Sequence, residues 1–351
     1  MKAALKTAGG RFEVTEVERP IIPSRDFVLA RVRVAGICGT DLRHWQKAEP
    51  ELECHIVGHE LAGEVVEVGE AVSRFKPGDR VVIETVMGDD VCEYCKIQRY
   101  NICEHLYDVR TKYVSRAYGE FVCGPESKFY HLPDHVSFEE AALIDTFSVC
   151  LHAHHHAGVE LNQKIVVIGA GPIGLGQLQL ARLAGADVLI ADPVQSSLDL
   201  ARELGAAETV DNGSDDLVAR VMAFTGGRGA DVVFECVGGE HMPETLPLAT
   251  RCVRRGGAVV VVGGFDKGEI AIPLEWQRIQ MSEIRILMSA SFAYHDIYPE
   301  QGTVLDLLAS GKLNASKLIT HRFDLDHIND AFETAAAKEH TGAVFVAITI
   351  S

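Results

Sequence analysis

The stretch KIVVIGAGPIG, residues 164–174, decides the fold of this chain, because an apolar strand runs directly into a glycine-rich turn. In the pattern GxGxxG, Gly169 permits a tight turn and Gly171 lets the backbone approach a pyrophosphate. Gly174 lets the helix that follows pack on the strand. Free N–H groups at the start of that helix favour an anion. The stretch therefore predicts a dinucleotide site at a strand–helix turn.

Asp192 supplies the second part of this signal, since it ends the next predicted strand about 20 residues further on. A carboxylate there hydrogen-bonds the ribose hydroxyls of NAD and repels the 2′-phosphate of NADP. Pro193–Ser197 holds no Arg or Lys that would offset the repulsion. The alternative is a glycine-rich turn in an α/β protein that binds another ligand. We expect NAD, held by Gly169, Gly171, Pro172, Ile173, Gly174 and Asp192.

Apolar strands and amphipathic helices alternate from Lys164 to about residue 290. The six predicted strands are KIVVIG, DVLIAD, ETV, ADVVFECVG, GAVVVVGG and IRILMSA. Continuous apolar strands separated by helices are typical of a parallel sheet covered on both faces. We therefore expect an α/β protein with a doubly wound sheet.

The flanking segments have a different pattern. Before residue 150, short strands such as Phe27–Val34, Leu61–Val68 and Arg80–Ile83 are divided by Gly and Pro turns, which predicts a barrel-like β domain. After residue 292, two helical stretches and a closing strand are expected to return to that domain. The predicted segments are 1–148 and 292–351 for the β domain and 149–291 for the nucleotide-binding domain.

Composition excludes several classes of partner. The chain has 351 residues and a net charge of -17, which argues against nucleic acid and anionic membranes. No stretch approaches the ~20 apolar residues that span a bilayer, and the first residues do not resemble a signal peptide. We expect a cytoplasmic protein with a small-molecule substrate. Its nine cysteines are unevenly spaced, which favours thiols or metal ligands over disulfides.

Two groups of residues have the chemistry of zinc ligands. The first lies in GICGTDLRHW and GHELAGEVVEVG, which contain Cys38, His59 and Glu60. The second lies in GDDVCEYCKIQRYNIC, residues 88–103, where three cysteines have the spacing C-x2-C-x7-C and Asp89 stands three residues before the first.

Taken together, these motifs resemble the zinc-dependent medium-chain dehydrogenases, and the polyol (sorbitol) dehydrogenase branch in particular. The resemblance covers essentially the full length. It implies a discontinuous GroES-like catalytic domain with the Rossmann domain inserted. It also implies a homo-oligomer, either a tetramer or a dimer.

The resemblance implies a catalytic zinc held by Cys38 and His59. The third ligand is Glu in the polyol branch, within ALIEPLSV; here the stretch is ALIDTFSV, so Asp145 takes that place and binds zinc directly or through a water. Glu60 approaches the metal in some states of relatives. The alternative is a buried thiol at Cys38 and a core histidine at His59.

The resemblance also implies a structural zinc, because relatives carry C-x2-C-x2-C-x7-C in this lobe. Asp89 occupies the first position and Cys92, Cys95 and Cys103 the other three, so we expect two zinc ions per chain. The competing interpretation is a lobe that lost its metal and kept three thiols.

The mechanism that the resemblance implies is hydride transfer from a secondary alcohol to NAD, with zinc lowering the pKa of the hydroxyl. Thr40 matches the residue that starts the family's proton relay. The relay histidine of relatives corresponds to Arg43 here, so His44 or solvent ends the relay.

Substrate-side candidates are Trp45, Glu60, Tyr294 and His295, the last two of which are equally consistent with a surface loop. The expected substrate is a polyol, sugar acid or cyclitol. Rival enzymes are a threonine-type or a simple alcohol dehydrogenase, and an alternative of another class is a non-catalytic NAD-binding relative.

Two further patterns are interpreted as structural. The run HAHHH, His152–His156, is expected to be a solvated helix face rather than a metal site. Cys54, Cys123, Cys150, Cys236 and Cys252 are expected to be small core residues.

Overall fold

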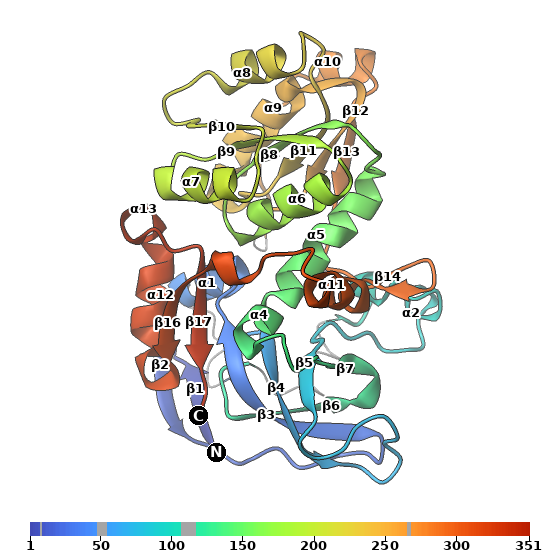
Figure 1. Ribbon diagram of the computed structural model, residues 1–351, viewed down its shortest axis with the longest axis vertical. Helices are drawn as coiled ribbons and strands as arrows, with labels where there is room; N and C mark the ends of the chain where they lie inside the picture. The colour runs from blue at the N-terminus through green and yellow to red at the C-terminus, as the bar shows by residue number, and fades with distance from the viewer. Residues whose placement is uncertain (8, 48–54, 107–116, 265–267) are drawn as a thin grey trace. The chain divides into compact units, whose positions relative to one another are not determined.

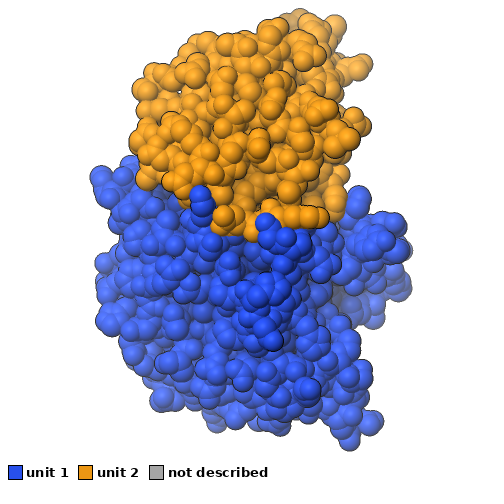
Figure 2. Space-filling model, in the orientation of Figure 1, with its two compact units in different colours: residues 1–145, 292–311, 315–351 blue, residues 146–291, 312–314 orange. Residues whose placement is uncertain are grey.

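The computed structural model describes residues 1–7, 9–47, 55–106, 117–264 and 268–351. It divides the chain into two compact units, which Figure 2 colours separately. Unit 1 comprises Met1–Asp145, Phe292–Gly311 and Ala315–Ser351, and unit 2 comprises Thr146–Ser291 and Lys312–Asn314. In the described ranges, no helix combines the length and the apolar character that crossing a membrane requires.

Unit 2 is built on a six-stranded parallel sheet in the order β10-β9-β8-β11-β12-β13 (Figure 1). The strands are β8 (Lys164–Ile168), β9 (Asp187–Ala191), β10 (Glu208–Val210), β11 (Ala230–Glu235), β12 (Val253–Val261) and β13 (Arg285–Met288). The helices are α6 (Pro172–Leu183), α7 (Gln195–Glu203), α8 (Leu217–Phe224), α9 (Met242–Cys252) and α10 (Trp276–Met281). This order confirms the doubly wound α/β fold.

The sheet order explains the apolar strands. Right-handed crossovers place α6 and α7 on one face and the helices after β10 on the other, so the central strands are buried on both sides. Ile165–Ile168 is accordingly fully buried. The chain reverses its direction of winding at β8, beside β11, which makes the carboxyl ends of these two strands the expected ligand site.

Unit 1 is built on a seven-stranded sheet in the order β16-β17-β3-β4-β5-β7, with β6 paired to β3. These strands are β3 (Phe27–Gly36), β4 (Leu61–Val68), β5 (Arg80–Ile83), β6 (Phe121–Pro125), β7 (Phe129–His131), β16 (Ile319–Asp324) and β17 (Phe345–Thr349). Two small antiparallel pairs accompany it: β1 (Lys2–Lys6) with β2 (Phe12–Glu16), and β14 (Tyr294–His295) with β15 (Tyr298–Pro299). The helices are α1 (Gly39–Gln46), α2 (Glu93–Lys96), α4 (Phe138–Ala142), α11 (Glu300–Ala309), α12 (Ile328–Ala336) and α13 (Lys338–Thr341).

The closing strand ties the end of the chain to its beginning. β17 pairs antiparallel with β3, and Ile348 lies opposite Ala35. An aromatic cluster supports this junction, because the ring of Phe12 packs 4.8 Å from that of Phe332 and 5.9 Å from that of Tyr118. The barrel core thus joins residues from both ends of the sequence.

Helix α5 (Ile144–Ala157) corrects one expectation. His152 and His154 are buried, at 6% and 7% exposure, so the prediction of a solvated histidine face is wrong. The ring of His154 stacks on that of Phe234 with 4.8 Å between the ring centroids, so the imidazole packs against the sheet of unit 2 instead of facing solvent. Cys123, Cys150 and Cys252 are buried and Cys236 is half-buried, whereas Cys54 lies outside the described residues.

Candidate metal and nucleotide sites

Unit 1 contains two groups of side chains whose potential ligand atoms lie within 4.8 Å of one another. One group is Cys38, His59 and Glu60, and the other is Asp89, Cys92, Cys95 and Cys103. Each belongs to a predicted ligand set.

Strand pairing assembles the first group. Cys38 follows β3 and precedes α1, while His59 and Glu60 precede β4, so the β3–β4 ladder brings the two motifs together. The N–H of Gly36 donates to the carbonyl of Glu60 at 2.8 Å. A side chain at Gly36 would collide with the Glu60 carboxylate and the Phe345 ring, so the glycine makes room for this group.

Asp41 fixes the orientation of His59, a role that our sequence reasoning missed. Its carboxylate lies 3.6 Å from His59 Nδ1 and accepts a hydrogen bond of 3.0 Å from the Tyr118 hydroxyl. With Nδ1 turned towards Asp41, Nε2 is the nitrogen that could bind a metal, and a carboxylate behind a metal-binding histidine is a recurrent arrangement. The available signal was the position of Asp41 in the first helical turn, three residues after Cys38.

The electrostatics of this pair agree with that role. Burial alone would lower the pKa of His59, but Asp41 and Cys38 outweigh it and raise the pKa well above its ordinary value. Burial alone would likewise raise the pKa of Asp41, whereas His59 and Tyr118 lower it. The site therefore holds Asp41 as a carboxylate facing the imidazole.

The remaining residues of this region occupy α1 and α5. The Arg43 guanidinium donates to the Thr40 hydroxyl at 3.1 Å, and His44 is half-buried on the same helix. Trp45 packs its ring 5.7 Å from that of Phe332 in the core of unit 1, and its role in substrate binding stays a prediction.

Asp145 is buried in the first turn of α5, at 8% exposure. It is not among the three residues that lie at mutual ligand distance in this part of the described chain. Its role as a third zinc ligand stays a prediction.

The second group forms a compact lobe around helix α2. The Sγ atoms of Cys92 and Cys103 are 3.8 Å apart. Backbone N–H groups point at the sulfurs: Cys95 N donates to Cys92 Sγ, and Asp89 N and His105 N donate to Cys103 Sγ, each at 3.4 Å. Such donors stabilise thiolates, which are the form that binds zinc.

The carboxylate of Asp89 is the fourth potential ligand of this group. Its Oδ1 accepts hydrogen bonds from the N–H groups of Cys92 (2.9 Å) and Val91 (3.0 Å), which lower the pKa of the carboxyl. Its Oδ2 is buried without a hydrogen-bond partner among the described residues, although His105 Nε2 lies 3.9 Å away. A buried, unpaired carboxylate oxygen beside three sulfurs fits a zinc ion, for which one oxygen and three thiolates are an acceptable set.

Burial and the neighbouring Cys92 raise the pKa of the Cys95 thiol to about 12. A bound cation is therefore what would ionise this thiol at neutral pH. Gly88 has no space for a side chain, because a Cβ would collide with Cys95 Sγ. The lobe is consequently packed tightly around its four ligand candidates.

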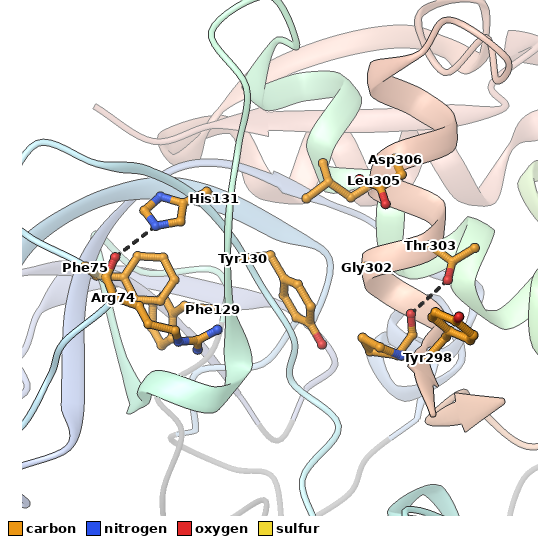
Figure 3. A pocket seen from close by; sticks show the side chains of 11 residues that line it. Arg74, Phe75, Phe129, Tyr130, His131, Tyr298, Gly302, Thr303, Leu305 and Asp306 are labelled. Carbon is orange, nitrogen blue, oxygen red and sulfur yellow. Dashed lines mark hydrogen bonds between the residues drawn. The ribbon is translucent and has the colours of Figure 1, made fainter. Parts of the chain in front are cut away.

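Tyr294 and His295 form β14, part of a short hairpin with β15. Tyr294 is half-buried and its ring meets that of Tyr100 edge-on at 6.2 Å, whereas His295 is exposed. The other strand of the hairpin borders a pocket of about 290 Å³, shown in Figure 3. Tyr130 and Tyr298 line it, and none of its lining residues belongs to either ligand group.

Unit 2 holds the nucleotide turn. Gly169 has φ +100°, and a Cβ on Gly174 would collide with the carbonyl of Gly169, so both glycines are required by the backbone. Asp192 is buried, at 4% exposure, where its Oδ2 accepts from Ala170 N at 2.7 Å and its Oδ1 from Val194 N at 2.8 Å. The acidic residue is thus bonded directly to the glycine-rich turn.

Comparison with known proteins adds to this geometry. The family model for a zinc-binding dehydrogenase matches residues 172–310, and that for an alcohol dehydrogenase GroES-like domain matches residues 24–134. Sorbitol dehydrogenase of Bacillus subtilis is 33% identical over 95% of this chain and 93% of its own length. Sorbitol dehydrogenase of Mus musculus is 35% identical over 88% and 85%, respectively. The solved structure of an Escherichia coli oxidoreductase of unknown specificity superposes over both full chains with a TM-score of 0.89 and 31% identity.

Proposed function

Because the chain belongs to the zinc-type medium-chain dehydrogenases, in the polyol branch, and is therefore an oxidoreductase, we propose that it oxidises a secondary hydroxyl of a polyol, sugar acid or cyclitol to a ketone with zinc and NAD. The observation that carries the proposal is the group of Cys38, His59 and Glu60 at mutual ligand distance. The likeness to sorbitol dehydrogenases supports the substrate class.

Cys38 and His59 would hold the catalytic zinc, with Asp145 as third ligand and Glu60 close by. When bound, zinc supplies a Lewis acid that lowers the pKa of the substrate hydroxyl, and NAD supplies the hydride acceptor. Asp41 keeps the imidazole of His59 in one orientation. Thr40 takes the substrate proton and passes it to solvent or His44.

We infer NAD rather than NADP from the surroundings of Asp192. The loop that follows β10 lies against Pro193, since a Cβ on Gly213 would be 3.4 Å from Pro193 Cβ. That loop brings a second carboxylate, Asp211, whose Oδ1 accepts from Gly213 N at 2.9 Å. Two acids beside the expected ribose disfavour a 2′-phosphate.

We also propose a structural zinc held by Asp89, Cys92, Cys95 and Cys103. The N–H donors to sulfur and the buried Oδ2 of Asp89 support it. Such a zinc would stabilise the lobe without touching substrate.

We also propose that the protein forms a homo-oligomer through the surface of unit 2. Trp276, Met281 and Met288 are each at least 63% exposed, and Met288 lies on β13, the edge strand of the parallel sheet. Apolar groups beside an unpaired sheet edge favour association with a second copy. Light scattering on the purified protein would give the mass, and a monomer at micromolar concentration would contradict this proposal.

The deciding experiment is NADH formation by the purified enzyme across short polyols, cyclitols, sugar acids, threonine and simple alcohols. Selective turnover of one polyol configuration supports the proposal. Activity on threonine or aliphatic alcohols with none on polyols would move the chain to another branch. Cys38→Ser is the matched control. This variant should bind NADH as tightly as wild type does, but it should not produce NADH from NAD and any alcohol.

A further inference from the structure

A single buried acid joins the carboxyl ends of β11 and β12. Glu235 is the last residue of β11 and is fully buried. Its Oε1 accepts three hydrogen bonds, from Val237 N (3.0 Å), Gly238 N (3.0 Å) and Thr245 Oγ1 (2.9 Å). Its carbonyl oxygen accepts two more, both 2.9 Å, from the N–H groups of residues 262 and 263. Glu235 therefore holds the loops that follow two neighbouring strands.

These two loops approach each other closely through their backbone atoms. Gly238 has φ +64°, and a Cβ there would lie 2.5 Å from the carbonyl carbon of Gly263. The N–H of Gly239 donates to the carbonyl of Gly264 at 2.8 Å. Glu235 Oε2 lies over the same place, 2.8 Å from where a Cβ on Gly263 would be. Any side chain at this junction would separate the loops.

The turn held by Glu235 also packs against the nucleotide motif. A Cβ on Gly169 would lie 3.0 Å from Val237 Cγ2 and 3.4 Å from the carbonyl carbon of Cys236. The N–H of Cys236 donates to the carbonyl of Ile168 at 2.9 Å. The first glycine of the motif thus has the Glu235 turn as its neighbour, at the edge of the sheet where ligands of this fold bind.

We propose that Glu235 is a positioning residue for the dinucleotide: it sets the turn at 236–239 so that Val237 closes one side of the Gly169 cradle. This inference rests on the proposed use of NAD. Without the carboxylate, the N–H groups of Val237 and Gly238 lose their acceptor, whereas the Thr245 hydroxyl keeps the His241 carbonyl at 3.1 Å. The turn then has to move to satisfy the two N–H groups. The cradle then loosens even though the glycine motif is intact.

The test is NADH binding to the whole enzyme, followed by nicotinamide fluorescence. Glu235→Ala should raise the Kd for NADH about tenfold or more, because two N–H groups of the turn then lose their acceptor. Glu235→Gln should stay within about threefold of wild type, since its amide oxygen can accept from the same donors. Thr245→Val, which removes one donor, should fall between the two and tests the proposal should Glu235→Ala not fold.

Asp231→Ala is the matched control, because the Asp231 carboxylate also accepts hydrogen bonds that link neighbouring strands, but at the amino end of β11. Its carboxylate accepts from Lys164 N at 2.8 Å and Arg254 Nε at 2.6 Å, joining the amino ends of β8 and β12. It should lower the melting temperature and leave the Kd for NADH unchanged. Equal effects of Asp231→Ala and Glu235→Ala on that Kd, or none from either, would overturn this inference alone. A wild-type enzyme that binds no NADH would overturn the proposed function with it.

Discussion

A buried histidine makes the stability of unit 2 depend on pH. His154 stacks on Phe234 at an angle of 24°, and its Nε2 has no hydrogen-bond partner among the described residues. Burial lowers the pKa of this imidazole to about 4. The folded protein thus keeps His154 neutral under conditions in which the unfolded chain protonates it.

The sign and size of the effect follow from that difference. Between pH 6.5, the ordinary value for histidine, and pH 4 the unfolded chain binds a proton that the folded chain does not, so stability falls as pH falls. Linkage puts the loss due to His154 at about 2 kcal/mol at pH 5, relative to pH 8, and about 3 kcal/mol at pH 4.

His154→Gln removes the titrating group while keeping a polar side chain. We would measure urea unfolding by circular dichroism at pH 8 and pH 5 for both proteins. The free energy of unfolding of wild type relative to the variant should fall by about 2 kcal/mol on acidification. Because every other group is common to both, the difference isolates His154.

His327→Gln is the control of opposite sign. The hydrogen bond that His327 donates from Nδ1 to the Asp324 carboxylate raises the pKa of His327, so its stabilisation is present below the unfolded pKa and is lost as pH rises through the folded one. The free energy of unfolding of wild type, relative to that of this variant, should therefore rise between pH 8 and pH 5. A His154→Gln difference that does not change between pH 8 and pH 5 would refute the reasoning about burial.

Three further predictions concern the proposed sites. Asp89→Ala should lower the melting temperature and reduce the zinc content, measured by atomic emission, from two ions per chain to one. Asp89→Cys should retain two zinc ions. Equal zinc content in wild type and Asp89→Ala would contradict the assignment of a structural zinc to this lobe. Asp192→Ser should improve the Kd for NADPH relative to that for NADH by about tenfold, since it removes a charge repulsion, and an unchanged ratio would count against our reading of cofactor choice. Cys38→Ser should lower kcat by about a thousandfold or more through loss of zinc, while circular dichroism stays native; retained turnover would remove Cys38 from the site.

The fold was largely predictable because its signals are local. The strands Leu61–Val68 and Arg80–Ile83 were predicted with the bounds that the structure has, since alternation and PGD turns mark their ends. The six apolar strands of unit 2 were found for the same reason, and the crossover rule assigns the helices to the two faces of the observed sheet.

What sequence could not show is which buried groups meet across the fold. Asp41 and His59 are 18 positions apart in the sequence, and only the β3–β4 pairing makes them neighbours. Glu235 lies inside the predicted strand ADVVFECVG, and nothing in the sequence indicates its three donors. The prediction for His154 failed because a histidine run suggests exposure to solvent, whereas its ring packs on Phe234 of strand β11.

The pairing of β17 with β3 has a consequence for how the protein is made. During synthesis, every strand of unit 2 has left the ribosome once Met288 has emerged, so that sheet can form early. On the edge of β3 away from β4, β6 covers Phe27–Arg31, but Val34–Gly36 must wait for Phe345–Thr349, more than 300 residues later. The nascent chain thus carries this exposed stretch of strand edge until residues 345–349 have been synthesised, and that interval is when chaperone protection matters most.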